Sequence, residues 1–426
     1  MTSKTNGSRV IPYNMLAECV STTYELVQRI VPEPEMNVLR TGLKYLEPTL
    51  IDCIQKADEG LPIIGHHFAF PAEYLYAFDC VPICIEATSY LLAALLPDGS
   101  EKYYDLITHW GHPYHTCSSQ KGVMGMVLDD LFQFDVITTP TAPCDNTYAS
   151  YPFFEYEGIP LVLTDMPFLK EEKSYEYFAE QIEMGLDEIG KIIGQEPNYE
   201  KLKKCLQIEN ETLKIELELY ELRKAVPCPV ESMMSPMSAA AQVFMAGRQE
   251  KLDFYKEIYE VVKRNYKRKE TPLEEERIRS VWPYMVVFFD LALCEWVDRE
   301  LGMSILLDIF SYNFYNEIDT SSKDKMLYGM AKKAMDFPMI KQSIEFYEDF
   351  LSYFVEMTRD YKADCAIFTS HLGCKQFGSI PQILREALRD ELGIPMLIVD
   401  IDVGDKRFAS IKTVKDKIRM FTNTLL

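Results

Sequence analysis

Three cysteines lie where the chain is expected to turn between strands and helices. Cys117 directly precedes a helical stretch, and Cys144 and Cys374 follow the apolar segments 135–140 and 365–370. A helix N-terminus presents unpaired N–H groups and the positive end of the helix dipole, so it lowers the pKa of a thiol and favours the thiolate. Thiolates are the usual ligands of iron–sulfur clusters. Three of them would leave one iron open to substrate or solvent.

Ordinary packing is the alternative for these cysteines, because a free cysteine is among the residue types most often buried. The chain contains 11 cysteines, and packing is also expected for the other eight. These are Cys19, Cys53, Cys205 and Cys294 in helical patterns, Cys80, Cys84 and Cys365 at strand starts, and Cys228 in a proline-flanked turn. The spacing of Cys117, Cys144 and Cys374 alone does not decide between metal binding and ordinary packing.

Common catalytic and nucleotide-binding motifs are missing from the sequence. It contains no G-x-x-x-x-G-K-[ST] loop and no G-x-G-x-x-G after a strand, so ATP hydrolysis and dinucleotide binding by the usual routes are not predicted. It also lacks C-x-x-C, H-E-x-x-H and G-x-S-x-G, the patterns of zinc, redox-dithiol and serine-hydrolase sites.

The composition narrows the class of protein. The formal net charge of −22 argues against binding nucleic acid or an anionic membrane. The N-terminal segment 1–9 is polar, and the apolar stretches 90–96 and 284–297 are too short or carry acidic residues, so neither an export signal nor a membrane span is expected. We expect a cytoplasmic protein, where an odd number of cysteines indicates thiols and a metal or redox site instead of disulfides.

Short apolar runs alternate with amphipathic helical stretches along the chain. The strands are expected at residues 61–64, 81–86, 135–140, 159–165, 277–282, 303–309, 365–370 and 394–400. The helices are expected at 175–193, 199–224, 239–265, 285–301, 339–361, 380–392 and 414–421. This alternation is typical of parallel sheets covered on both faces by helices.

The predicted fold is α/β, with two open parallel-sheet domains of the flavodoxin or Rossmann-like kind. An N-terminal helical section (1–60) precedes the first domain (61–197), and a helical segment (198–275) separates it from the second domain (276–426). Ligands of open α/β sheets bind beyond the carboxyl ends of the strands, so the residues just after each strand are the candidates for function.

These features together resemble the family that joins 2-hydroxyacyl-CoA dehydratase subunits, benzoyl-CoA reductase subunits and double-cubane-cluster proteins. Residues 363–410, with the Gly373-Cys374 turn after a strand, are similar to its C-terminal signature. Residues 115–126 and 140–145 resemble its first two cysteine loops, and Ser280–Pro283 resembles the strand that opens the second domain of the larger dehydratase subunit. The resemblance extends from about residue 63 onward.

The resemblance implies that Cys117, Cys144 and Cys374 hold a [4Fe–4S] cluster. It also implies a heterodimer with a second subunit of the family and a separate ATP-dependent iron–sulfur activator, which supplies one electron at low potential. That electron would pass to the thioester carbonyl of an (R)-2-hydroxyacyl-CoA, and the resulting ketyl radical would expel the 2-hydroxyl group to give an enoyl-CoA. An open-site cluster is sensitive to oxygen, so an anaerobic host is expected.

The resemblance also singles out acid–base candidates near the pocket. Glu86, expected at the end of a strand, falls where catalytic dehydratase subunits place an acidic residue for the 2-hydroxyl or β-carbon. The alternative role of Glu86 is structural, as a carboxylate at the start of a helix that is stabilised by the helix dipole. His67, together with His66, would line the pocket. His112 and His115 would donate hydrogen bonds to cluster sulfurs or lie on the surface.

Other functions remain open from the sequence. A benzoyl-CoA-reductase-like enzyme would hold a similar cluster, and a double-cubane protein would recruit further cysteines such as Cys80, Cys84 and Cys365. A non-catalytic partner subunit would relay electrons only, and a metal-free α/β binding protein would need none of the three loop cysteines.

Overall fold

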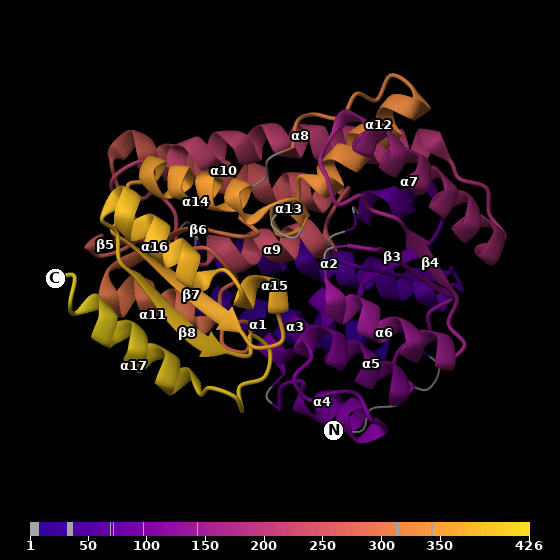
Figure 1. Cartoon of the computed structure of the whole chain (residues 1–426), viewed down its shortest axis with the longest axis horizontal. Coiled ribbons are helices and arrows are strands. Elements are labelled where there is room, and N and C mark those ends of the chain that lie inside the picture. The colour runs from indigo at the N-terminus through magenta and orange to yellow at the C-terminus, as the bar shows by residue number, and fades with distance from the viewer. Residues whose placement is uncertain are drawn as a thin grey trace.

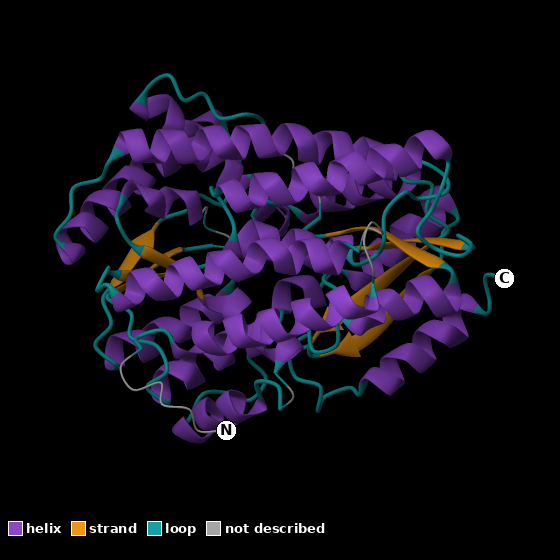
Figure 2. Ribbon diagram, turned by 180° about the vertical axis from the view of Figure 1, so that it is seen from behind, coloured by secondary structure: helices purple, strands orange, loops and turns teal. Residues whose placement is uncertain are grey.

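Two parallel sheets and many helices make up the computed structural model of the chain, which describes residues 8–31, 37–68, 70, 72–96, 98–142, 144–311, 315–341 and 344–426. The two sheets lie toward opposite ends of the molecule, with helices packed around and between them (Figures 1 and 2). The predicted α/β class with two open parallel sheets is confirmed. The residue limits of the four segments stay a prediction.

The strands of the described chain fall within about two residues of their expected positions at most ends. They are β1 (Ile63–His66), β2 (Val81–Cys84), β3 (Val136–Pro140), β4 (Leu161–Thr164), β5 (Ile278–Trp282), β6 (Met303–Asp308), β7 (Cys365–His371) and β8 (Met396–Ile401). The run expected at 81–86 ends two residues early, at Cys84, and the helix α3 begins at Ile85.

The helices before and within the first sheet are α1 (Ile11–Ile30), α2 (Val38–Asp58), the 3₁₀ helix η1 (Ala72–Ala77), α3 (Ile85–Leu95), α4 (Glu101–Trp110), α5 (Ser118–Leu128) and α6 (Asp145–Tyr156). The middle helices are α7 (Glu172–Ile193), α8 (Tyr199–Arg223), α9 (Met234–Phe244) and α10 (Gln249–Arg268). The later helices are α11 (Ala292–Leu301), α12 (Lys323–Met335), α13 (Pro338–Lys341), α14 (Tyr347–Asp360), α15 (Lys375–Gly378), α16 (Pro381–Leu392) and α17 (Ile411–Thr422).

Both sheets have the same strand order. The first is β2-β1-β3-β4 and the second is β6-β5-β7-β8, with every neighbouring pair parallel. In each sheet the chain leaves its first strand toward one edge and then returns to the other side, so the order reverses beside β1 and beside β5. Such a reversal opens a crevice at the carboxyl ends of the strands, where ligands of this fold bind.

Alternating side chains of the first sheet enter two different hydrophobic cores. Ile63 faces a large core that continues through α9 into the second sheet, whereas Ile64 faces the core formed with α7 and α12. In Figure 1, α9 lies between the two sheets and α8 and α10 run side by side across the molecule. The shared core therefore fixes the two sheets against each other.

Three predicted helices are interrupted in the structure. The helix expected over 239–265 is divided between α9 and α10 at Gly247, whose φ of +71° is incompatible with a continuing helix. The one expected over 285–301 starts only at Ala292, because the apolar residues before it form a buried loop instead of a helical face. The one expected over 339–361 is divided between α13 and α14, and Glu345 in the connection has a φ of +62°.

The structure places the other eight cysteines in packed elements or turns, as predicted. Cys19, Cys53, Cys205 and Cys294 lie in helices, and Cys84 and Cys365 lie in strands. Cys80 is buried directly before β2, and Cys228 is buried in the connection between α8 and α9. Among the described helices, none combines the length and the apolar character that crossing a membrane requires.

Candidate functional site

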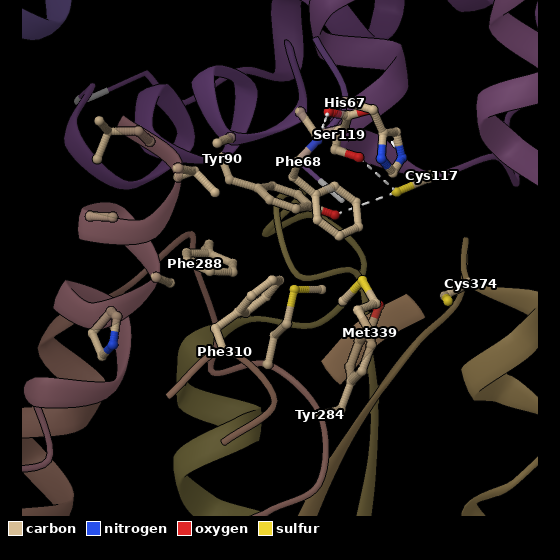
Figure 3. Close-up of a pocket in the computed structure, with 18 of the residues that line it drawn as sticks. His67, Phe68, Tyr90, Cys117, Ser119, Tyr284, Phe288, Phe310, Met339 and Cys374 are labelled. Atoms are coloured by element: carbon tan, nitrogen blue, oxygen red, sulfur yellow. Dashed lines mark hydrogen bonds and ion pairs between the residues drawn. The ribbon is translucent and has the colours of Figure 1, made fainter. Parts of the chain in front are cut away.

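A cavity of about 100 Å³ lies between the carboxyl ends of the two sheets. His67 and Phe68 reach it directly after β1, and Tyr284 and Met285 reach it directly after β5. Segments after β2, β3, β6 and β7 complete its wall, together with α9. Side chains from both sheets converge on this space in Figure 3. The cavity therefore occupies the crevice that the strand order predicts.

All three predicted cysteines line this one cavity. Cys117 is the residue before α5, Cys144 the residue before α6 and Cys374 the residue before α15. The prediction that each would lie at a strand end or a helix start is confirmed. Pro143, the neighbour of Cys144, lies outside the described residues. Loops that are widely separated in the sequence thus bring three thiols to the same space.

Asn146 connects the three cysteine loops. It lies two residues after Cys144, its Oδ1 accepts a hydrogen bond from the backbone N–H of Cys117 at 3.0 Å, and its Nδ2 donates to the carbonyl of Gly373 at 2.6 Å. Lys375 and Asp145 add an ion pair of 2.5 Å between the loops of the two sheets. One amide side chain thereby sets the spacing of all three loops.

The loops of Cys117 and Cys374 approach each other closely at Gly373. A Cβ atom at this position would lie 2.6 Å from the Cα atom of Cys117 and 2.8 Å from its nitrogen. Those are backbone atoms, which cannot rotate away as a flexible side chain can. Glycine is therefore required here to let the two loops touch.

Cys117 is surrounded by hydrogen-bonding groups. Its Sγ lies 3.0 Å from Ser119 Oγ, 3.4 Å from Tyr90 Oη and 3.3 Å from His371 Nε2. Burial alone would raise the pKa of the thiol, but the charge and hydrogen bonds of His371, with Ser119 and Tyr90, outweigh it and lower the pKa to about 7. Cys117 is therefore prepared to be a thiolate.

His371 is held in the orientation that this contact needs. Its Nδ1 lies 3.4 Å from the backbone nitrogen of Val403, and its Nε2 faces Cys117 at 3.3 Å. Asp402 lies 3.8 Å from Nδ1 and, after the opposing effect of burial, helps to raise the pKa of His371. The carboxylate of Asp402, the imidazole of His371 and the thiol of Cys117 thus lie in a row that runs from the second sheet to the first.

The expectation that the helix ends would lower the pKa of all three thiols is wrong for two of them. Burial and the nearby Cys117 and Cys374 thiols raise the pKa of Cys144 to about 12. Burial likewise raises the pKa of Cys374 to about 11, although a hydrogen bond from Tyr284 opposes the shift. Loss of hydration around the two sulfurs is the main cause of both increases.

Glu86 lines the cavity from the first turn of α3, not from the end of a strand as predicted. Its Oε1 accepts a hydrogen bond of 2.6 Å from Gln120 Nε2, and its Oε2 accepts one of 3.1 Å from the backbone N–H of Phe68. Burial nevertheless raises the pKa of the carboxyl to about 8. A helix-start carboxylate stabilised by the dipole would have a lowered pKa, so burial is the dominant effect.

His67 lies beside Glu86, with its Nε2 3.4 Å from Oε1. Burial, with a smaller contribution from His66, lowers the pKa of His67 to about 3, so its imidazole is neutral at ordinary pH. His66 is the last residue of β1 and is also buried, and it faces a smaller neighbouring cavity instead of the one with the cysteines. The structure therefore brings only His67 into contact with the site.

The sequence of the chain matches a known protein family over most of its length. A family model described as "2-hydroxyglutaryl-CoA dehydratase, D-component" matches residues 67–424. The chain belongs to this family.

Two curated relatives of the family are dehydratase subunits. The (R)-phenyllactyl-CoA dehydratase alpha subunit of Clostridium sporogenes is 23% identical over 260 residues, which cover 58% of this chain and 60% of that protein. The (R)-2-hydroxyglutaryl-CoA dehydratase, subunit alpha, of Acidaminococcus fermentans is 23% identical over 265 residues, covering 59% of this chain and 51% of that protein. The chain thus spans between half and three fifths of the length of these relatives.

The three cysteines fit a metal cluster better than a single metal ion. Within the described ranges, no three side chains of His, Cys, Asp or Glu are placed to bind one ion together. A single ion such as zinc holds each ligand about 2–2.3 Å away, so its ligands crowd together. Thiolates of an iron–sulfur cluster bind different irons and lie further apart. An all-sulfur donor set around one cavity suits the second arrangement.

Several residues of this dehydratase-family site were missed from the sequence, and of the two positions expected for His115 the structure shows the surface one. The hydrogen-bonding partners of Cys117 include His371, whereas His115 is exposed and His112 is buried elsewhere. His371 had a usable signal, because it directly ends the strand expected at 365–370. Asn146 and Tyr90 had none, since their contacts depend on how distant loops pack.

Proposed function

We propose that this chain is the cluster-bearing subunit of a 2-hydroxyacyl-CoA dehydratase, in which Cys117, Cys144 and Cys374 hold a [4Fe–4S] cluster. The observation that carries the proposal is the convergence of these three thiols on one cavity that also contains Glu86 and His67. Membership in the dehydratase family supports it. A second subunit and an ATP-dependent activator are part of the proposal, as is a cytoplasmic location.

The bound cluster would supply the single electron that makes loss of the 2-hydroxyl group feasible. The protein's part begins with thiolate formation. His371, Ser119 and Tyr90 stabilise the thiolate of Cys117, and Tyr284 hydrogen bonds to Cys374. Asn146 keeps the loops at the spacing that a shared ligand needs.

Glu86 is suited to move the protons of a dehydration. Because its pKa is raised to about 8, the carboxyl is mostly protonated near neutral pH and can donate to the departing 2-hydroxyl oxygen. The carboxylate that remains can then accept the proton from the β-carbon, which returns Glu86 to its starting state and releases one water. Neutral His67 lies 3.4 Å from Oε1 and positions this carboxyl.

The packing of the other cysteines bears on the double-cubane alternative. A second cluster would need further thiolates around a cavity, but Cys80, Cys84 and Cys365 are fully or nearly fully buried in or beside strands. None of these three cysteines lines the cavity that holds Cys117, Cys144 and Cys374. These features favour a single cluster in this chain.

The proposal is tested by measuring iron and acid-labile sulfide per chain after anaerobic purification, with and without the neighbouring subunit. About four of each per chain are expected for one [4Fe–4S] cluster. Replacing Cys117, Cys144 or Cys374 with serine should remove most of the iron. Cys19→Ser is the matched control, because Cys19 is only partly buried in α1 and does not line the cavity.

Other results would identify the alternatives. About eight irons per chain would indicate the double-cubane branch, and no iron in the folded protein under both conditions would overturn the proposal. Ring reduction of an aromatic acyl-CoA without dehydration would indicate the reductase branch. Intact iron without binding of acyl-CoA to this chain would indicate a relay subunit.

A further inference from the structure

The cavity has one polar end and a long apolar wall. The polar residues of the lining include His67, Glu86, Ser119 and Gln120 near Cys117, together with Thr147 and Gln376. The wall is formed mainly by Phe68, Leu91, Met237, Phe244, Phe288 and Phe310. Figure 3 shows Phe288 and Phe310 on the second sheet's side of the space, opposite Phe68 and Tyr90. A substrate whose reacting atoms lie at the cysteines must place its acyl side chain against this wall.

No lysine or arginine lines the described part of the cavity. Among the residues that the structure does not describe, Lys4 is the only lysine or arginine, and the others have neutral or acidic side chains. Among the described residues that line the cavity, a carboxylate at the end of an acyl chain would therefore meet no lysine or arginine.

Two buried cations in the neighbouring cavity are already matched by carboxylates, and the buried Lys121 after Gln120 donates to the carbonyl of Tyr114 outside the lining. Lys251 and Lys333 lie behind Phe68, in the smaller neighbouring cavity. Lys251 forms ion pairs with Glu209 at 2.9 Å and Glu216 at 3.8 Å. Lys333 pairs with the same Glu209 at 3.0 Å and with Glu73. The two lysines and three glutamates leave no surplus positive charge for an acidic ligand.

From this distribution of charge we propose that the cavity accepts 2-hydroxyacyl-CoA thioesters with an uncharged, apolar side chain, aromatic or branched aliphatic, and discriminates against those ending in a carboxylate. The inference rests on the proposed function and narrows its substrate class. The physical reason is that a carboxylate loses its hydration in an apolar space and gains no ionic partner. An apolar side chain gains from leaving water on the same surface.

The test separates binding from catalysis by using thioesters that cannot lose water. The probes are 3-phenylpropanoyl-CoA, 4-methylpentanoyl-CoA and glutaryl-CoA, whose acyl groups lack the 2-hydroxyl. Their dissociation constants are measured on the anaerobically purified holoprotein with its partner subunit. Both apolar thioesters are expected to bind at least about 100-fold more tightly than glutaryl-CoA, in line with the discrimination that buried, unpaired polar groups produce.

A charge introduced into the wall should change this ratio in a defined direction. Met237 lies on α9 and lines the cavity away from the polar end, and lysine has a similar length. Met237→Lys should reduce the preference for apolar thioesters at least about 10-fold, because it offers the missing partner to a carboxylate. Met237→Leu, which keeps an apolar surface of similar volume, should leave the preference unchanged.

The possible outcomes distinguish the substrate class from the proposed function. If glutaryl-CoA binds as tightly as the apolar thioesters to the unmodified protein, the substrate class is overturned while the dehydratase function stands. If none of the three thioesters binds to iron-loaded protein, the proposed function itself fails. The measurement on the unmodified protein decides the matter even if the Met237 variants do not fold.

Discussion

The two sheets have the same strand order, yet their carboxyl edges carry different chemistry. The first sheet brings two thiols, Cys117 and Cys144, and the pair Glu86 and His67. The second brings one thiol, Cys374, and otherwise mostly aromatic and aliphatic side chains. The same strand order thus forms a polar edge with thiols and a carboxyl in one sheet and a mostly apolar edge in the other.

The difference teaches that the site requires the carboxyl edges of both sheets to pack against each other, because neither sheet contains all of its groups. His371 of the second sheet is the group that most lowers the pKa of Cys117 in the first. Asn146, after the first sheet's β3, accepts a hydrogen bond from the backbone N–H of Cys117 and donates one to the Gly373 carbonyl of the second sheet's loop. Each edge lacks a component that the other supplies, and the predictions below separate the two contributions.

The largest expected effect comes from the proton-handling group of the first sheet. Glu86→Gln should lower the rate of dehydration by about 10²–10⁴-fold, the usual contribution of a general acid–base group. The cluster should be retained, since the side chain is not a ligand, so iron content and turnover are measured together. The exposed Glu391→Gln serves as control. Unchanged turnover with full iron would exclude the proton-transfer role.

The same carboxyl should make stability depend on pH. The pKa of Glu86 is about 8 in the folded protein against an ordinary value of 4.5, so the folded state holds this proton more tightly. Its contribution is fully present below pH 4.5 and is lost as the pH rises to about 8. Relative to Glu86→Gln, the wild type should lose at most about 1.4 kcal/mol of unfolding free energy per pH unit in that window. Parallel curves in denaturant titrations at several pH values would contradict this.

A third prediction concerns the contact between the two edges. Gly373→Ala places a Cβ atom against the Cys117 backbone and should force the loops apart. We expect a loss of about 1–3 kcal/mol in the free energy of unfolding, as for other overpacked sites, together with a loss of iron. Gly378→Ala is the control, because a Cβ there meets no atom within 4 Å. Equal iron content in both variants would show that the close approach is not needed.

The smallest effect is expected at the thiol itself. In cluster-free protein at pH 7, Cys117 should be alkylated by iodoacetamide before Cys144 and Cys374, whose pKa values are raised to about 12 and 11. His371→Asn removes the main cause of this difference and should slow alkylation of Cys117 about 10-fold, the lower limit for losing a hydrogen bond to a charged group. Mass spectrometry of the three peptides, with the exposed His109→Asn as control, measures the effect.

The fold could largely be predicted because its signals are local. Apolar runs such as 135–140 and 365–370 end in turn residues, and each became a buried parallel strand. The cysteine positions followed from the same signals, since Cys144 and Cys374 come directly after these strands. Prediction was weaker where a helix was inferred from apolar content alone, as in 285–301, because a buried loop has the same composition as a buried helix.

The site could be predicted only in part because its decisive contacts are not local. His371 and Cys117 lie 254 positions apart, and Asn146 and Gly373 lie 227 positions apart. No periodicity connects such residues, so the histidine at the cysteine was sought at His112 and His115, its neighbours in sequence. The raised pKa of Glu86 depends in the same way on burial beneath several elements.

The hydrogen bond from Asn146 to the Gly373 loop also joins two parts of the chain that are synthesised at different times. The loop of Cys144 is synthesised about 230 residues before the loop that Lys375 brings against Asp145. Until that later loop arrives, the first sheet can offer a cluster only two thiols. Under the proposed function, retention of iron would report that the chain has been made as far as the Cys374 loop and that this loop has docked, so a product truncated before it would be recognisable by its lack of metal.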